Sequence, residues 1–185
     1  MLEIRWHGRG GQGVVTAAEI LATAVINEGK YAQAFAAFGP ERRGAPVLAF
    51  TRINDSEILL RTQIYEPDIV VVLDQSLFND SEIGKGLKKG GIAVVNSSKN
   101  SEEIFTLFPN ASKIAIVDAT NIAIEILGVA VTNTSILGAL VRATNIVKIE
   151  SIEKVLKERF KGSVAEKNIK AVRESFNRTL IYNRG

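Results

Sequence analysis

Residues 2–13 read Leu-Glu-Ile-Arg-Trp-His-Gly-Arg-Gly-Gly-Gln-Gly, an apolar stretch that runs into a cluster of glycines. Gly8, Gly10 and Gly13 have the spacing G-x-G-x-x-G, which is typical of a phosphate-binding turn between a first strand and a first helix. The residues that follow predict a helix over 14–28, because their apolar side chains recur at helical spacing. Such a turn presents backbone N–H groups and the positive end of a helix to an anion. A turn that binds nothing remains the alternative, because glycines also close ordinary strand-to-helix connections.

The rest of the chain alternates strand-like and helix-like segments. Uninterrupted β-branched runs are typical of parallel strands buried on both faces, and they occur at residues 69–73, 92–95 and 114–117. Residues 31–38 are expected to be the second strand of a βαβ unit. These patterns predict an α/β fold of Rossmann-like type, with a mostly parallel sheet and flanking helices.

Two further features complete the expected fold. Residues 47–53 and 58–60 flank a polar turn and predict a β-hairpin inserted into the alternating pattern. Two amphipathic helices are expected at the end of the chain, the first opening at Ser151 and the second at a capping box of Ser163 and Glu166. The length of 185 residues fits a single domain over residues 1–185.

The composition excludes several kinds of chemistry. The chain has no cysteine, so it cannot hold an iron–sulfur cluster on cysteine ligands, and it has one histidine, His7, which excludes a histidine-rich metal site. We expect no metal on this chain. The net charge of +3 is spread along the sequence without interleaved aromatics, so we expect no nucleic-acid partner. No apolar run is long enough to cross a bilayer and no signal peptide is evident at the start, so we expect no membrane partner and a cytoplasmic protein.

A second loop candidate lies at residues 39–46, which read Gly-Pro-Glu-Arg-Arg-Gly-Ala-Pro. We expect this loop beside the first one, where Arg42 and Arg43 suit phosphate oxygens of NADP or coenzyme A. Salt bridges across a subunit interface are an equally weighted alternative. An NAD site is disfavoured, because the second predicted strand does not end in the acidic residue that would hold the ribose.

Polar residues near the ends of the later strands favour helix capping over ligand binding. Asp74 and Asp118 directly follow buried runs, at positions where aspartate often caps a helix. Residues 132–135 read Thr-Asn-Thr-Ser before an apolar helix, and their hydroxyls are expected to cap it, with ligand contact as the alternative.

Three stretches resemble the gamma subunits of the pyruvate:ferredoxin and related 2-oxoacid:ferredoxin oxidoreductases: residues 7–13, 38–46 and 133–139. The resemblance covers nearly the whole chain. It implies a complex with alpha, beta and delta subunits that decarboxylates a 2-oxoacid, reduces ferredoxin and forms an acyl-coenzyme A. It also implies that thiamine diphosphate, magnesium and iron–sulfur clusters belong to the other subunits, and that this chain is not active alone.

The motifs of this resemblance and the loop chemistry together give a candidate cofactor-binding set, with coenzyme A as the candidate ligand. No catalytic residue is assigned to this chain. The set consists of Gly8, Arg9, Gly10, Gly11, Gln12, Gly13, Arg42, Arg43, Asn133 and Thr134. A stand-alone NADP-dependent reductase, with His7 as its one evident proton donor, and a nucleotide-binding regulator are the alternatives.

Overall fold

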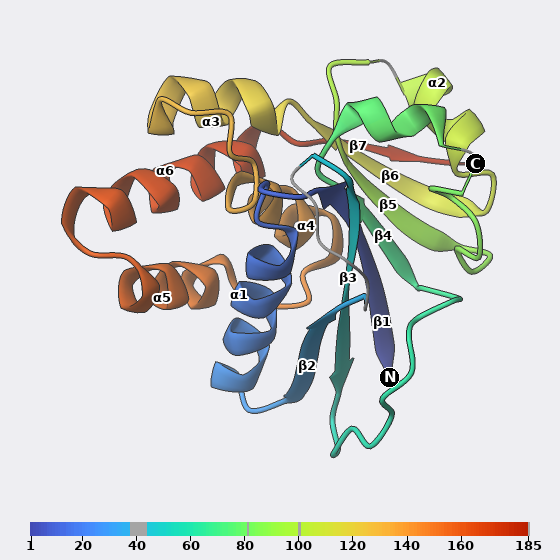
Figure 1. Cartoon of the computed structure of the whole chain (residues 1–185), viewed down its shortest axis with the longest axis horizontal. Coiled ribbons are helices and arrows are strands. Elements are labelled where there is room, and N and C mark those ends of the chain that lie inside the picture. The colour runs from blue at the N-terminus through green and yellow to red at the C-terminus, as the bar shows by residue number, and fades with distance from the viewer. Residues whose placement is uncertain (38–43, 81, 100, 185) are drawn as a thin grey trace.

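The computed structural model describes residues 1–37, 44–80, 82–99 and 101–184. The described strands form one sheet in the order β2-β3-β1-β4-β5-β6-β7 (Figure 1). The strands are β1 (Leu2–Arg9), β2 (Tyr31–Ala36), β3 (Pro46–Asn54), β4 (Ile69–Val72), β5 (Gly91–Asn96), β6 (Ala111–Val117) and β7 (Leu180–Asn183). The helices are α1 (Val14–Asn27), the 3-10 turn η1 (Gln75–Asn79), α2 (Ser101–Leu107), α3 (Ala119–Leu127), α4 (Ser135–Thr144), α5 (Ile149–Arg159) and α6 (Gly162–Arg178).

The centre of the sheet is parallel, as the sequence predicts. β1 pairs with β4, β4 with β5 and β5 with β6, all in parallel, and each residue of β4 is buried. Continuous valine and isoleucine runs suit these strands because both of their faces are covered. The α/β class with a mostly parallel sheet and flanking helices is therefore confirmed.

Helices cover the two faces of the sheet unequally (Figure 1). α1, α3, α4, α5 and α6 share one hydrophobic core with the sheet, in which Trp6 and Leu137 are fully buried. η1 and α2 share a smaller core with the opposite face of β4, β5 and β6. Gly138 lets α4 lie close to α6, because a Cβ there would overlap with the backbone at Val172.

The predicted hairpin is wrong. β3 pairs with β1 over Pro46–Ile53 on one side and with β2 over Ala49–Asn54 on the other, both antiparallel, and residues 58–60 form no strand. β1 and β2 are connected through α1 and run parallel to each other, but β3 lies between them in the sheet. The reason is that Trp6 of β1 lies opposite Ala49 of β3 and donates its indole N–H to Thr51 at 2.9 Å, a contact that local turn patterns do not encode.

The C-terminal helices are confirmed, but their predicted starts are wrong. α5 begins at Ile149 and α6 at Gly162, and neither N-cap residue makes a side-chain capping bond. Ser163 therefore lies inside the first turn of α6 and does not cap it. The strand β7, which follows α6 and pairs antiparallel with β6, was not predicted.

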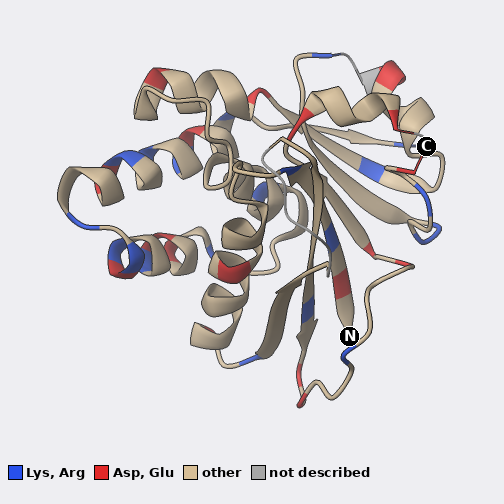
Figure 2. Ribbon diagram, in the orientation of Figure 1, with Lys and Arg blue, Asp and Glu red and all other residues tan. Residues whose placement is uncertain are grey.

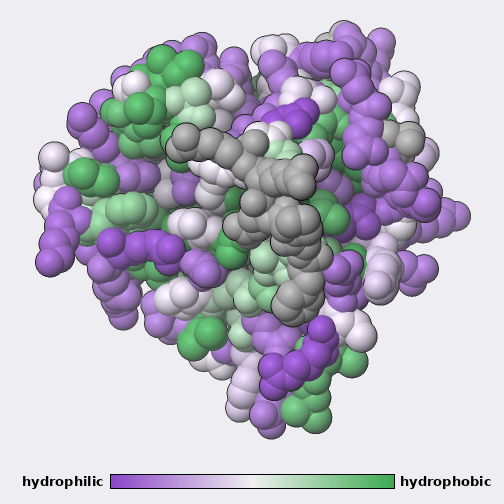
Figure 3. Space-filling view, viewed as in Figure 1, coloured by the Kyte–Doolittle hydropathy of each residue, from purple (hydrophilic) through white to green (hydrophobic). Residues whose placement is uncertain are grey.

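The surface is mixed in character. Figure 2 shows many charged residues along α5 and α6, which have polar outer faces. Figure 3 shows hydrophilic residues over much of one face and a hydrophobic group near α3, where Ile124 is half exposed. No helix among the described residues is long and apolar enough to cross a membrane.

Candidate functional site

The glycine loop (residues 8–13) connects β1 to α1 at the carboxyl end of the parallel strands. Gly11 and Gly13 have φ values of 93° and 75°, in the left-handed region that favours glycine. A Cβ on Gly8 would overlap with Val14 Cγ2, so this position also requires a glycine. The sequence prediction of a tight strand-to-helix turn is therefore confirmed.

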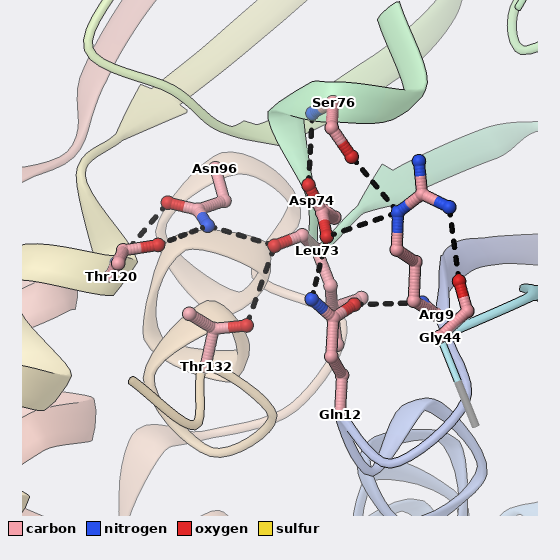
Figure 4. Close-up of polar contacts among 9 residues, drawn as sticks. All are labelled: Arg9, Gln12, Gly44, Leu73, Asp74, Ser76, Asn96, Thr120 and Thr132. Atoms are coloured by element: carbon pink, nitrogen blue, oxygen red, sulfur yellow. Dashed lines mark hydrogen bonds and ion pairs between the residues drawn. The ribbon is translucent and has the colours of Figure 1, made fainter. Parts of the chain in front are cut away.

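Side chains within the loop hold it to the neighbouring turn (Figure 4). Gln12 Oε1 accepts a hydrogen bond from the Arg9 backbone N–H at 2.7 Å, and Gln12 Nε2 donates to Asp74 Oδ2 at 2.7 Å. Arg9 Nε donates to Ser76 Oγ at 2.9 Å and lies 3.5 Å from Asp74 Oδ2. Arg9 Nη1 donates to the Gly44 carbonyl oxygen at 3.0 Å. Much of the donor capacity of Arg9 is therefore used inside the protein.

Asp74 is the anchor of these contacts. Its Oδ1 accepts from the Ser76 backbone N–H at 2.8 Å, so the predicted cap is confirmed at η1. Partial burial alone would raise the pKa of Asp74. Hydrogen bonds from Ser76 and Gln12 and the charge of Arg9 outweigh burial and lower that pKa. Asp74 is thus an ionised group that neutralises Arg9.

The first turn of α1 remains open. Its N-cap, Gly13, makes no side-chain capping bond, and the backbone N–H groups of Val14, Val15 and Thr16 have no acceptor among the described residues. These residues line a cavity of about 450 Å³ together with Arg9, Gly10, Gly11, Ala36 and Val47. These N–H groups can donate hydrogen bonds to the oxygens of an anion bound at the positive end of the helix.

The second predicted loop meets the first. Gly10 N–H donates to the Ala45 carbonyl oxygen at 2.8 Å, and Gly44 N–H donates to the Gly10 carbonyl oxygen at 3.1 Å. The expected proximity of the two loops is confirmed for these residues. Arg42 and Arg43 lie outside the described residues.

Asn133 and Thr134 lie between the glycine loop and α6. Gly13 and Asn133 are in close contact, since a Cβ on Gly13 would overlap with Asn133 Nδ2. Asn133 Oδ1 accepts from the Thr134 N–H at 2.9 Å, and the fully buried Thr134 hydroxyl bonds Asn168 Oδ1 at 2.7 Å. The expectation that hydroxyls here cap the following helix is wrong, because Thr134 is the N-cap of α4 but makes no side-chain capping bond. Its hydroxyl bonds α6 instead.

The other polar side chains near these strand ends form hydrogen bonds within the protein. Asn96 Nδ2 donates to the Leu73 carbonyl oxygen and to Thr120 Oγ1, both at 2.8 Å, and the Thr132 hydroxyl reaches the same carbonyl oxygen at 3.4 Å (Figure 4). Asp118 Oδ1 accepts from the Asn121 N–H at 2.9 Å, which confirms the predicted cap of α3. The described residues contain no group of three or more His, Asp or Glu side chains placed to hold a metal ion.

His7 is poorly suited to acid catalysis. Arg5 Nε donates a hydrogen bond to His7 Nε2 at 3.0 Å. Burial, and then the charge of Arg5, lower the pKa of His7 to about 3, although Asp80 acts in the opposite direction. His7 is therefore neutral near pH 7, and the alternative of an NADP-dependent reductase loses its one evident proton donor.

Comparison with known proteins agrees with this architecture. Residues 3–178 match the family model described as pyruvate ferredoxin/flavodoxin oxidoreductase. The chain belongs to this family. The resemblance found in the three sequence stretches is thus confirmed.

Relatives in the pyruvate ferredoxin/flavodoxin oxidoreductase family are similar over almost their entire lengths. The pyruvate/ketoisovalerate oxidoreductases common subunit gamma of Thermococcus kodakarensis is 58% identical over 183 residues, which cover 98% of this chain and 99% of that protein. The pyruvate synthase subunit PorC of Methanocaldococcus jannaschii is 50% identical, with coverage of 97% and 98%. The crystal structure of the pyruvate oxidoreductase subunit PORC of Thermotoga maritima has a TM-score of 0.88 and 41% identity, and each chain covers 97% of the other.

Sequence reasoning missed the residues that hold the glycine loop in place. Asp74 was interpreted as a helix cap in preference to a ligand-binding residue, and Ser76 was not singled out. The available signal was the position of Asp74 directly after a buried parallel strand, since the carboxyl ends of such strands lie at the edge where the first loop also lies.

Proposed function

We propose that this chain is the gamma subunit of a multi-subunit 2-oxoacid:ferredoxin oxidoreductase. The complex would convert pyruvate or 2-oxoisovalerate and coenzyme A to the acyl-coenzyme A and carbon dioxide, and pass two electrons to ferredoxin. The observation that carries the proposal is the 58% identity, over 98% of the chain, to a protein named as the gamma subunit common to pyruvate and ketoisovalerate oxidoreductases. The partners are alpha, beta and delta subunits, and the site of action is the cytoplasm.

The composition of the chain supports this division of work. A chain without cysteine has no thiolates for iron–sulfur clusters, and its described residues offer no cluster of metal ligands. We propose, as the resemblance to the family implies, that thiamine diphosphate, magnesium and iron–sulfur clusters belong to the other subunits. Thiamine diphosphate supplies the carbanion chemistry, and this chain contributes orientation, electrostatics and exclusion of water.

Within this chain, we propose that the glycine loop faces the active site of its partners and positions coenzyme A. The open N–H groups of Val14, Val15 and Thr16 fit the anionic oxygens of that cofactor. Arg42 and Arg43 would add paired hydrogen bonds to phosphate. Asn133 supports the loop through its contact with Gly13, and Thr134 supports Asn133 from a buried position. Gln12 and Arg9 keep the loop in shape through Asp74.

The subunit assignment is tested by native affinity purification of this chain from its own cells without oxygen. We expect brown material that contains a thiamine-diphosphate subunit and a cysteine-rich ferredoxin-like subunit, and that oxidises pyruvate in a coenzyme A-dependent reaction. A colourless single chain that retains NADP would overturn the proposal and support an independent nucleotide-binding protein.

The role of the arginines is tested by Arg42→Ala combined with Arg43→Ala in the assembled complex. Ligand binding predicts a KM for coenzyme A raised at least tenfold, with unchanged assembly. The control is Lys154→Ala with Lys157→Ala, which removes two exposed cations from α5 and is expected to change neither property. Unchanged coenzyme A kinetics would contradict ligand binding, and loss of assembly would favour a role in the subunit interface.

A further inference from the structure

The sheet changes character on the face opposite α1. Over β4, β5 and β6 this face is apolar and is covered by η1 and α2. Over β1 and β3 the same face carries the charged residues Glu3, Arg5 and Arg52. Charged residues of these strands are coloured in Figure 2. The residues on this part of the face are Glu3, Arg5, His7, Leu48, Phe50 and Arg52. A face of this kind needs a polar cover or a partner, because buried charge must be compensated.

A covering segment (residues 55–68) supplies part of this cover. Arg52, which is almost fully buried, pairs with Glu3 at 2.9 Å, and its guanidinium lies 3.5 Å from the carbonyl oxygens of Leu60 and Gln63. Gln33 of β2 donates to the Ile58 carbonyl oxygen at 2.9 Å. The covering segment thus closes the amino-terminal part of β1 and leaves the end near His7 uncovered.

At that end lies a cavity of about 630 Å³, here named the His7 cavity. Its floor includes Arg5 and His7, which are only 8% and 9% exposed, together with buried Leu77 and Ile83. The half-buried side chain of Leu48 forms an apolar wall. The rim consists of exposed residues: Pro46, Tyr65, Glu66, Asp80, Glu82, Lys85 and Gly86. The volume is in the range of specific binding sites.

The floor of the His7 cavity keeps polar capacity that the protein itself does not use. Arg5 donates to His7 and to the carbonyl oxygens of Tyr65, Ile83 and Lys85, but it forms no ion pair with any described carboxylate. Because His7 accepts at Nε2, the proton of its neutral ring is on Nδ1, which has no acceptor among the described residues. An N–H donor that lines the cavity beside a buried cation favours an incoming oxygen acceptor.

The rim of the His7 cavity has the opposite charge. Lys85 pairs with Glu82 at 2.8 Å, whereas Glu66 and Asp80 have no ion pair within the described part of the chain. The rim therefore has a surplus of negative charge, which repels a small free anion and attracts a cation. An occupant that satisfies floor, wall and rim together carries a carbonyl oxygen, an apolar group and a positive charge.

A polypeptide segment has all three groups. We propose that the His7 cavity is a docking site for a basic segment of another subunit of the complex, with an apolar side chain against Leu48 and a Lys or Arg at Glu66 and Asp80. A backbone carbonyl oxygen of that segment accepts from His7 Nδ1. This inference rests on the proposed function, because it requires a multi-subunit complex.

Photocrosslinking tests the contact directly in the assembled complex. Tyr65 is 72% exposed on the rim, so replacing it with p-benzoylphenylalanine leaves the core intact. We expect a crosslink to one segment of another subunit in which Lys or Arg neighbours an apolar residue, identified by mass spectrometry. The same substitution at Val164, 51% exposed on α6, is the control and is expected not to crosslink to that segment. No crosslink from Tyr65, a crosslink to a second copy of this chain, or one to an acidic segment would overturn the proposal.

Charge reversal tests the rim. Glu66→Lys combined with Asp80→Lys is expected to weaken the association of this chain with its partners at least tenfold and to reduce the salt dependence of binding. The matched control, Glu158→Lys with Glu166→Lys on α5 and α6, makes the same change of charge at exposed residues and is expected to stay within twofold. Equal affinity for the Glu66/Asp80 variant would overturn the docking site and leave the proposed function intact. Failure of the unaltered chain to bind any partner would overturn both.

Discussion

Gln12 Nε2 donates a 2.7 Å hydrogen bond to Asp74 Oδ2, and this contact joins the glycine loop to the turn after β4 across 62 positions of sequence. The same Gln12 side chain accepts from the Arg9 backbone N–H. The side-chain amide of Gln12 thus bonds one residue within the loop and one residue outside it. The shape that leaves the first turn of α1 open therefore depends on a pair of residues from two different strand ends.

Gln12→Ala and Asp74→Ala should each lower the free energy of unfolding by about 1–2 kcal/mol. Gln12→Ala removes two partly buried hydrogen bonds, and Asp74→Ala removes one partly buried and one exposed hydrogen bond together with the ion pair to Arg9. The double variant should show a coupling of about 0.5–1 kcal/mol or more, since the two side chains share a bond. Urea denaturation measures all of these quantities. Asp55→Ala, which removes only the exposed ion pair with Lys30 at 3.7 Å, is the control and should change stability by less than about 0.5 kcal/mol. Strictly additive effects of the Gln12 and Asp74 changes would contradict a shared contact.

The lowered pKa of Asp74 predicts an acid limit to this stabilisation. A carboxylate whose pKa is lower in the folded protein contributes stability above its unfolded pKa, about 3.9, and loses that contribution as the pH falls through the folded value. The stability difference between the unaltered chain and Asp74→Asn should therefore be constant from pH 7 to pH 5 and shrink below about pH 4. Urea titrations at pH 7, 5 and 3 test this, and a difference that grows on acidification would contradict it.

His7 predicts a second, separate pH window. Its pKa is about 3 in the folded chain against 6.5 for an unperturbed histidine, so between these values the unfolded chain binds the extra proton. Stability should therefore fall as the pH drops below 6.5, with a limiting slope of about 1.4 kcal/mol per pH unit. His7→Gln, which keeps an acceptor for Arg5, should remove this slope between pH 6.5 and pH 5.

Because His7 is the chain's one histidine, its imidazole signal in NMR is unambiguous. We expect no titration of that signal between pH 7.5 and pH 5. A midpoint near 6.5 would show that the ring is not held neutral by burial and by Arg5.

The fold was predictable where the signal is local. The β-branched runs of β4, β5 and β6 and the glycine spacing before α1 each fix their own element, because burial on two faces and left-handed backbone conformations restrict the residues allowed. The position of β3 was not predictable from such patterns, since its pairing with β1 depends on cross-strand contacts such as that between Trp6 and Thr51. The α5 and α6 starts were misplaced because capping patterns occur in sequence without being used in the structure.

In the candidate site too, local features were predictable and contacts between distant parts of the chain were not. The glycine loop was predicted from its spacing, and its proximity to residues 44 and 45 followed from the topology of an α/β sheet. The partners of Gln12 and the burial of Thr134 depend on α6 and on the turn after β4, which are distant in sequence. Hydroxyl and amide side chains have many possible partners, so their contacts follow only from the packed structure.

Gly13→Ala should show how closely the glycine loop is held against Asn133. Gly13 and Gly29 both have positive φ, 75° and 87°, so alanine at either position incurs similar backbone strain of about 1 kcal/mol. A Cβ at Gly29 meets no atom within 4 Å, whereas one at Gly13 overlaps with Asn133. Gly13→Ala should therefore lower the free energy of unfolding by about 1–3 kcal/mol more than Gly29→Ala does. Combining Gly13→Ala with Asn133→Ala should recover part of this excess, as measured by urea denaturation. Equal effects of the two glycine changes, or no recovery in the double variant, would mean that the loop can move away from Asn133 and that this asparagine does not position it.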